Sequence, residues 1–321
     1  MSVDRILLVS LDNLGDMVFA SALAPPLHER FPHATLDIWC KEYTADVARL
    51  VPGVGNVIAS DPFWDRAPGR RKGSLISFLR AVQRVRAHRY EIAVLAAAPW
   101  RTAAAVAMTR IPMRIGLRRR KNARFLTHVL PDENPREPVM SELARLLGPL
   151  GIATGPLNYR LDPASLTARR AHLATKIPQP YVALHPFASK QNRCVALPIW
   201  IQVAQRLCAR GLSILWIGSA RELATLRAMA ADPSWRFVDR ESDGTLADSA
   251  AALSAAVLFV GHDSGPLHIA GAFGVPVVGI FAPGEPLRTF PQGVGPARLL
   301  ARPSPAGITA DEIMREVDAL S

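Results

Sequence analysis

The sequence has few cysteines, no long hydrophobic run and no recognisable leader, and each absence excludes a class of protein. Only three cysteines occur among 321 residues, and their odd number and wide spacing exclude a disulfide framework or a cysteine-rich zinc site. No apolar run approaches the roughly 20 residues of a membrane-spanning helix. The N-terminal apolar stretch is flanked by Asp4, Asp12 and Asp16, unlike a secretory signal peptide. We therefore expect a cytoplasmic globular protein.

Acidic residues are also scarce, which leaves a strongly basic chain. The 38 Lys and Arg residues exceed the 27 Asp and Glu residues and give a formal net charge of +11. Part of the excess lies in the stretch 110–124, RIPMRIGLRRRKNAR, which contains no acidic residue. Such a run binds nucleic acid, an anionic membrane surface or an acidic substrate, or is only a solvated loop. Neither interleaved aromatic residues nor a recognition motif favours nucleic acid, so an anionic surface or acceptor is the better prediction.

Short apolar segments rich in β-formers alternate with helical patterns in both halves of the chain. The expected strands span residues 5–11, 34–40, 53–60, 90–98, 181–184, 212–218, 235–239, 257–261 and 275–281. This alternation predicts parallel sheets covered by helices on both faces. We therefore predict an α/β protein of two doubly wound, Rossmann-like domains, residues 1–170 and 171–321, facing a cleft.

Ligands of open parallel sheets bind at the turns that follow the carboxyl ends of strands, and polar residues occur at these turns here. After the first strand, Gly15 allows a tight turn and Asp16 begins a helix. A carboxylate in that place is a general base, or only a first-turn acid that complements the helix dipole. Asp12 is a rival base that position alone does not exclude.

The second half has a similar turn after the strand at 181–184, where Ser189, Lys190 and Arg193 follow. Cations and hydroxyls in such a loop suit a diphosphate, although exposed loop residues would look the same. Glu222 follows the strand at 212–218, and a carboxylate there binds ribose hydroxyls or simply begins a helix.

The segment GHDSGPLHIA, residues 261–270, carries more polar residues than a strand-to-helix turn requires. Asp263 or Ser264 can cap the helix and Pro266 suits its first turn. Capping does not explain Gly265, which permits close approach of a ligand, or His268 one turn into the helix. A helix start with free N–H groups favours an anion. Together these turns suit transfer of a group from a nucleotide diphosphate donor to an acceptor hydroxyl.

Several motifs resemble those of one family over nearly the whole chain. They are ILLVSLDNLGDMV near the start, RIG at 114–116, LHPFAS at 184–189, IGSARE at 217–222 and GHDSGPLHIAGAFGVPVVGIFAPGEP from residue 261. The chain resembles the bacterial heptosyltransferases of lipopolysaccharide core synthesis, glycosyltransferase family 9. That family shows Asp-Thr-Gly-Pro, then two residues and His-Leu-Ala-Ala, where Ser264 here replaces the Thr.

The resemblance implies a two-domain B-type glycosyltransferase fold and an inverting, metal-independent transfer from an ADP-heptose donor, with no cofactor. The absence of any Asp-x-Asp sequence agrees with that implication. By position, the family's general base corresponds to Asp16 and its ribose-binding carboxylate to Glu222. The donor-binding residues carried over are Ser189, Lys190, Arg193, Glu222, Asp263, Ser264, Gly265 and His268. Lys190 or Arg193 replaces the phosphate-binding Lys, but this loop lacks the Trp of the family's K-x-W-P form.

The basic stretch lies in the half expected to bind the acceptor. We predict that Arg118, Arg119, Arg120 and Lys121 attract an acidic glycolipid or glycan, with peripheral contact at the inner face of the inner membrane. Two alternatives remain open at this level. A nucleotide-sugar epimerase shares the architecture but needs no acceptor, and a non-catalytic nucleotide-sugar-binding scaffold needs no base.

Overall fold

The computed structural model describes residues 3–65, 73–131, 134, 136–188, 190–229, 232–239 and 245–320. The chain divides into two compact units after Tyr159, earlier than the predicted boundary at 170. The earlier boundary arises because residues 160–174 pack on the second unit. The backbone N–H of Leu161 donates to the Ala272 carbonyl at 3.1 Å, and Arg169 forms an ion pair with Asp248.

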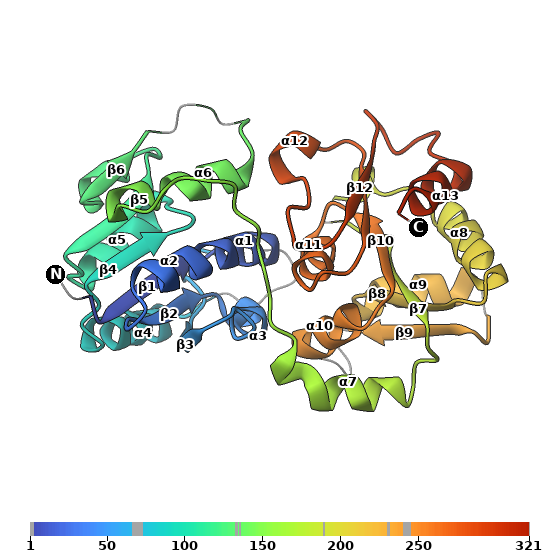
Figure 1. Ribbon diagram of the computed structural model, residues 1–321, viewed down its shortest axis with the longest axis horizontal. Coiled ribbons are helices and arrows are strands. Elements are labelled where there is room, and N and C mark those ends of the chain that lie inside the picture. Colours follow the sequence, from blue (N-terminus) through green and yellow to red (C-terminus); the bar gives the residue numbers. More distant parts are fainter. Residues whose placement is uncertain are drawn as a thin grey trace. The chain divides into compact units, whose positions relative to one another are not determined.

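The first unit is a six-stranded parallel sheet in the order β3-β2-β1-β4-β5-β6 (Figure 1). The strands are β1 (Arg5–Ser10), β2 (Thr35–Cys40), β3 (Val54–Ala59), β4 (Ile92–Leu95), β5 (Met113–Leu117) and β6 (His128–Leu130). The helices are α1 (Leu14–Ala20), α2 (Ala24–Arg30), α3 (Ala45–Ala48), α4 (Leu75–Ala87), α5 (Trp100–Met108) and α6 (Val139–Arg145). Phe78, Val82 and Val85 of α4 pack with Val106 of α5 on one face of the sheet.

The second unit repeats this plan in the order β12-β11-β10-β7-β8-β9, again all parallel. Its strands are β7 (Tyr181–His185), β8 (Ser213–Gly218), β9 (Trp235–Asp239), β10 (Leu258–His262), β11 (Val277–Phe281) and β12 (Ala297–Ala301). Its helices are α7 (Thr167–Ala174), α8 (Leu197–Ala209), α9 (Ala220–Met229), α10 (Leu246–Ser254), α11 (Gly265–Ala272), α12 (Pro286–Thr289) and α13 (Ala310–Asp318). The predicted class, two doubly wound α/β units, is confirmed.

Three strands do not correspond to any predicted one: β5, β6 and β12. The basic stretch is therefore not a single loop, because its middle forms β5 beside β4. Arg114 lies on this strand, and its guanidinium donates to the carbonyls of Phe125 and Ile111 at 2.8 and 2.5 Å. These bonds hold Arg114 within the unit, so after the exposed Arg110 the next exposed cation of the stretch is Arg118.

Candidate active site

Each sheet has a switch point, where the strand order reverses and the connections leave in opposite directions. In the first unit it lies between β1 and β4, and in the second between β7 and β10. The crevice beyond the carboxyl ends of such strands is the ligand site of open parallel sheets. Asp16 follows β1, Lys190 and Arg193 follow β7, and Asp263 follows β10. Most of the predicted site residues therefore lie beyond the carboxyl ends of the strands at a switch point, where ligands of such sheets bind.

Asp16 lies in the first turn of α1 beside a second carboxylate. The backbone N–H of Asn13 donates to Asp16 Oδ2 at 3.1 Å and to Asp12 Oδ1 at 2.9 Å, so the two carboxyl groups converge on one donor. Burial, followed by the charge of Asp12, raises the pKa of Asp16 to about 7. A carboxyl group with that pKa accepts a proton near neutral pH, as a general base must.

A buried lysine near this carboxylate pair was not predicted from the sequence. Lys41 directly follows β2, is 6% exposed, and pairs through Nζ with Asp65 Oδ2 at 2.5 Å. Its charge opposes the rise in the pKa of Asp16. Ligands of open parallel sheets bind beyond the carboxyl ends of strands. Lys41 directly follows β2, so its position in the sequence could have identified it as a candidate site residue, as it did for Asp16.

The basic loop, residues 118–124, follows β5 and is held by one buried amide. The Asn122 side chain donates to the carbonyls of Ala98 and Leu117, both at 2.8 Å, and accepts from the Arg119 N–H at 2.9 Å. Arg119 also forms an ion pair with the buried Glu142 at 3.2 Å. A scaffolded loop of this kind presents its remaining charges from a fixed backbone.

The basic loop lines an open hollow of about 500 Å³ formed by Arg118, Arg119, Arg120, Lys121 and Ala123. Arg118, Arg120 and Lys121 are exposed. The structure therefore brings the four predicted acceptor-binding residues together around one concave surface. The bond between Asn122 and Ala98 also joins this loop to the start of α5, where Trp100 is 40% exposed.

In the second unit, residues 190–195 form a compact segment that we call the cation loop. A short 3-10 turn, Gln191–Arg193, is closed by the bond from the Arg193 N–H to the Lys190 carbonyl at 3.0 Å. Lys190 is exposed and Arg193 half-buried, and no carboxylate among the described residues is seen paired with either. Ser189, the third predicted loop residue, lies outside the described residues.

Glu222 lies in the first turn of α9 and caps that helix. Its Oε2 accepts from the Ser219 N–H at 2.8 Å and from the Ser219 hydroxyl at 2.9 Å. The plainer interpretation of this residue, a carboxylate at a helix start, is therefore realised. The hydrogen bonds to Ser219 leave Oε1 as the oxygen that can accept from a ligand.

The segment after β10 holds four predicted residues together at the start of α11. Asp263 Oδ1 lies 3.4 Å from His268 Nε2, and Thr289 Oγ1 donates to Asp263 Oδ2 at 3.3 Å. Ser264 occupies the N-cap position of α11, as predicted, but its hydroxyl donates to the His262 carbonyl at 3.0 Å and accepts no bond from the helix. Ser264 is therefore an N-cap by position only, and the Gly265 end of α11 has no side-chain hydrogen-bond cap. Such an uncapped helix start favours an anion.

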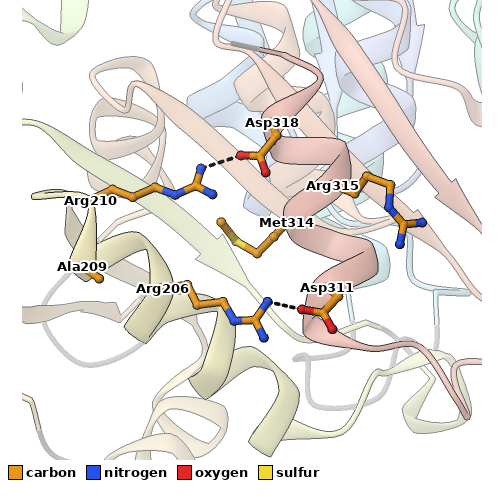
Figure 2. Close-up of a pocket in the computed structure, with 7 residues that line it drawn as sticks. All are labelled: Arg206, Ala209, Arg210, Asp311, Met314, Arg315 and Asp318. Atoms are coloured by element: carbon orange, nitrogen blue, oxygen red, sulfur yellow. Dashed lines mark hydrogen bonds and ion pairs between the residues drawn. The ribbon is translucent and has the colours of Figure 1, made fainter.

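A further hollow, of about 570 Å³, lies between α8 and α13 (Figure 2). Arg206 pairs with Asp311 at 2.5 Å and Arg210 with Asp318 at 2.6 Å, on either side of Met314. These pairs bridge the two helices. The last turn of α8 leads directly into the start of β8, so the hollow lies towards the amino ends of the strands. Ligands of such sheets bind at the opposite edge, beyond the carboxyl ends of the strands.

Two all-parallel, doubly wound units, each with polar residues beyond its switch point, form the architecture of the B-type glycosyltransferase fold. Residues 78–301 match the sequence model of "Glycosyltransferase family 9 (heptosyltransferase)", and the chain belongs to that family.

Known proteins similar to the chain agree with this membership. "Lipopolysaccharide heptosyltransferase 3" of Escherichia coli is 23% identical over 278 residues, which cover 83% of this chain and 80% of the relative. A family 9 glycosyltransferase from Veillonella parvula has the same fold, with a TM-score of 0.85, 16% identity and coverage of 100% and 98% of the two chains. The E. coli ADP-heptose lipopolysaccharide heptosyltransferase II gives a TM-score of 0.81 at 20% identity, with 98% of each chain covered.

Proposed function

We propose that the protein transfers heptose from ADP-heptose to a hydroxyl of lipopolysaccharide core or a related glycan, with inversion and without a metal ion. The observation that carries the proposal is Asp16, a carboxyl group at a switch point with its pKa raised to about 7. Family membership supports the class of reaction, and the similar heptosyltransferase II, an ADP-heptose enzyme by name, supports the donor.

Asp16 serves as the general base in this proposal. The acceptor hydroxyl gives its proton to Asp16 while its oxygen bonds to the anomeric carbon from the face opposite the diphosphate. The bond from that carbon to the diphosphate oxygen breaks, and ADP leaves with the electron pair. A binding scaffold has no use for a base, so this residue favours an enzyme. An epimerase also needs a base, to remove a proton from the sugar, and it is membership of the glycosyltransferase family that favours transfer over epimerisation.

The departing diphosphate needs positive partners, and the second unit supplies them. Arg193 and Lys190 of the cation loop offer charge-assisted hydrogen bonds, and the uncapped Gly265 end of α11 offers a backbone donor. In this proposal these groups stabilise the negative charge of the departing diphosphate, which a metal ion does in metal-dependent glycosyltransferases. Glu222 Oε1 accepts from the ribose, and the Asp263–His268 pair binds the donor sugar.

The acceptor is proposed to bind through the basic loop. Exposed cations around one hollow suit a phosphorylated glycolipid, and the neighbouring exposed Trp100 suits the boundary between headgroups and acyl chains. Peripheral contact with an anionic membrane follows from the same residues. No helix among the described residues is long and apolar enough to cross a bilayer.

The proposal is tested first by the thermal midpoint of the protein with ADP, UDP, GDP or CDP, each with a chelator present. A ligand at about 100 times its Kd stabilises the folded state by roughly 2.7 kcal/mol. Stabilisation by ADP alone, followed by turnover of ADP-heptose, supports the proposal. Stabilisation by another nucleotide refutes the donor assignment, and no stabilisation by any of them favours a different function.

The transfer rate is expected to depend on pH through Asp16. Only the ionised carboxyl group accepts a proton, and its pKa of about 7 places half-ionisation there. We expect the rate to fall about tenfold per pH unit below about pH 6 and to level off above about pH 8. Rates at saturating donor across pH 5 to 9 measure this, and a profile that is flat down to pH 5 would contradict it.

Replacing Arg118, Arg120 and Lys121 together with serine is expected to weaken acceptor binding selectively. Loss of three charges around one hollow raises the KM for the acceptor about tenfold or more at low salt, and the difference shrinks as ionic strength rises. ADP affinity stays unchanged. The matched control replaces Arg206, Arg210 and Arg315 with serine, which removes the same charge beside the hollow of Figure 2. An equal effect of the two triple variants would refute a specific role for the basic loop.

A further inference from the structure

One buried histidine joins the cation loop to the end of β10. The backbone N–H of Val195 donates to His262 Nε2 at 3.1 Å, and these residues are 2% and 1% exposed. Val195 ends the cation loop, and His262 immediately precedes Asp263. The bond therefore connects two segments that the proposed function assigns to the same diphosphate.

The hydrogen bond fixes the protonation state of the imidazole. Because Nε2 accepts, the ring proton of the neutral form lies on Nδ1. Burial, followed by the neighbouring His185, lowers the pKa of His262 to about 4, and the ring is therefore neutral near pH 7. The backbone of Ile280, followed by the charge of Asp263, acts in the opposite sense on this pKa. The hydrogen bond from the Val195 N–H requires this neutral form, because only then can Nε2 accept.

Neighbouring residues hold the buried imidazole in place. The ring packs edge-on against Trp200 of α8 with centroids 5.4 Å apart, and the backbone of Ile280 on the adjacent strand β11 acts on the ring as well. The ring therefore presents Nε2 to the Val195 N–H from a position that its surroundings fix.

Val195 fixes the end of the cation loop in two ways. Its side chain packs into the core of the second unit, and its backbone N–H is bound to His262. The loop backbone next to Arg193 is therefore tied to the core and to the end of β10.

We infer that His262 is a positioning residue that anchors the cation loop to β10 through Val195, and so sets where Arg193 meets the donor diphosphate. The anchor itself follows from the contacts above, whereas its effect on the donor rests on the proposed function. His262 touches neither donor nor acceptor in this scheme. It acts through the loop backbone.

The test compares His262→Leu with His262→Gln, in which the side-chain carbonyl can replace Nε2 as acceptor. Tyr181→Phe is the matched control, because it removes another buried hydrogen bond of the same unit, from Tyr181 Oη to the Ala252 carbonyl at 2.6 Å. Amide hydrogen exchange over residues 190–197 measures the anchor. Calorimetric Kd values for ADP and for adenosine measure its effect on phosphate binding.

We expect His262→Leu to speed exchange in this segment about tenfold or more and to raise the Kd for ADP about tenfold, with the Kd for adenosine unchanged. His262→Gln restores both, and Tyr181→Phe changes neither, although its thermal midpoint falls. Should the leucine variant fail to fold, His262→Asn, whose carbonyl is too short to reach Val195, is expected to behave in the same way.

Unchanged exchange in both His262→Leu and His262→Asn overturns the anchor. Faster exchange with an unaltered Kd for ADP overturns the positioning role, as does an equal loss of ADP and adenosine affinity. If the wild-type protein binds no ADP, the proposed function fails. The exchange measurement still decides whether His262 holds the loop.

Discussion

Asp16→Asn is expected to lower the transfer rate about 100- to 10,000-fold, the usual contribution of a general base. Donor binding should remain unchanged, because the substitution lies in the unit without the predicted donor residues. The fold should also persist, since the asparagine carbonyl can still accept from the Asn13 N–H. Initial rates with ADP-heptose and the Kd for ADP measure the two effects separately.

The variant is also expected to be at least as stable as the wild type at pH 8. Folding raises the pKa of Asp16 from 3.8 to about 7, so the folded state binds this proton more tightly than the unfolded state does. Stability from this group is therefore lost as pH rises from about 4 to 7. A neutral asparagine does not incur that loss, and thermal midpoints at pH 5 and pH 8 measure the difference.

Asp12→Asn is the control for assigning the base. It removes the neighbouring charge that helps to raise the pKa of Asp16, so the acid limb of the pH–rate profile should move to lower pH while transfer continues. If Asp12→Asn abolishes transfer and Asp16→Asn does not, Asp12 is the base and the assignment must be reversed.

Arg193→Gln is expected to weaken ADP binding about 10- to 100-fold, whereas Lys190→Gln changes it less than about threefold. The half-buried Arg193 guanidinium loses less solvation on binding an anion than an exposed group of equal charge, and it can bind phosphate oxygens in a bidentate manner. Lys190 is exposed, and solvent weakens its interaction with the diphosphate.

Calorimetry with ADP and adenosine measures this difference, and adenosine affinity should not change in either variant. A larger effect of Lys190→Gln would identify Lys190 as the phosphate-binding residue. Equal effects would mean that the cation loop supplies only general positive charge.

The positions of the candidate residues were predictable from the sequence where a topological rule determines them. Asp16, Arg193 and Asp263 each follow a strand that reads as apolar and β-rich, and strand ends determine ligand positions in such sheets. Strand β5 was not predicted because Arg114 interrupts its apolar pattern, and only the structure shows that this guanidinium serves the backbone carbonyls of Ile111 and Phe125.

Contacts between distant segments could not be predicted at all. The bond from Val195 to His262 joins residues 67 positions apart, and nothing in either local sequence indicates it. A serine hydroxyl in a turn can donate to any of several nearby backbone carbonyls. That Ser264 donates to the His262 carbonyl is therefore determined by the folded backbone. Lys41 gives a positional signal, but its pairing with Asp65 depends on the packing of two loops.

Every residue of helix α11 from Pro266 to Ala272 is buried. A helix packed on all sides cannot shift to suit a different ligand without disturbing the core around it. The first turn of α11 is therefore expected to keep its position while the sequence around it diverges. New donor preferences would have to arise in the surrounding segments, such as residues 190–194 and 283–289, whose residues are exposed or half-buried.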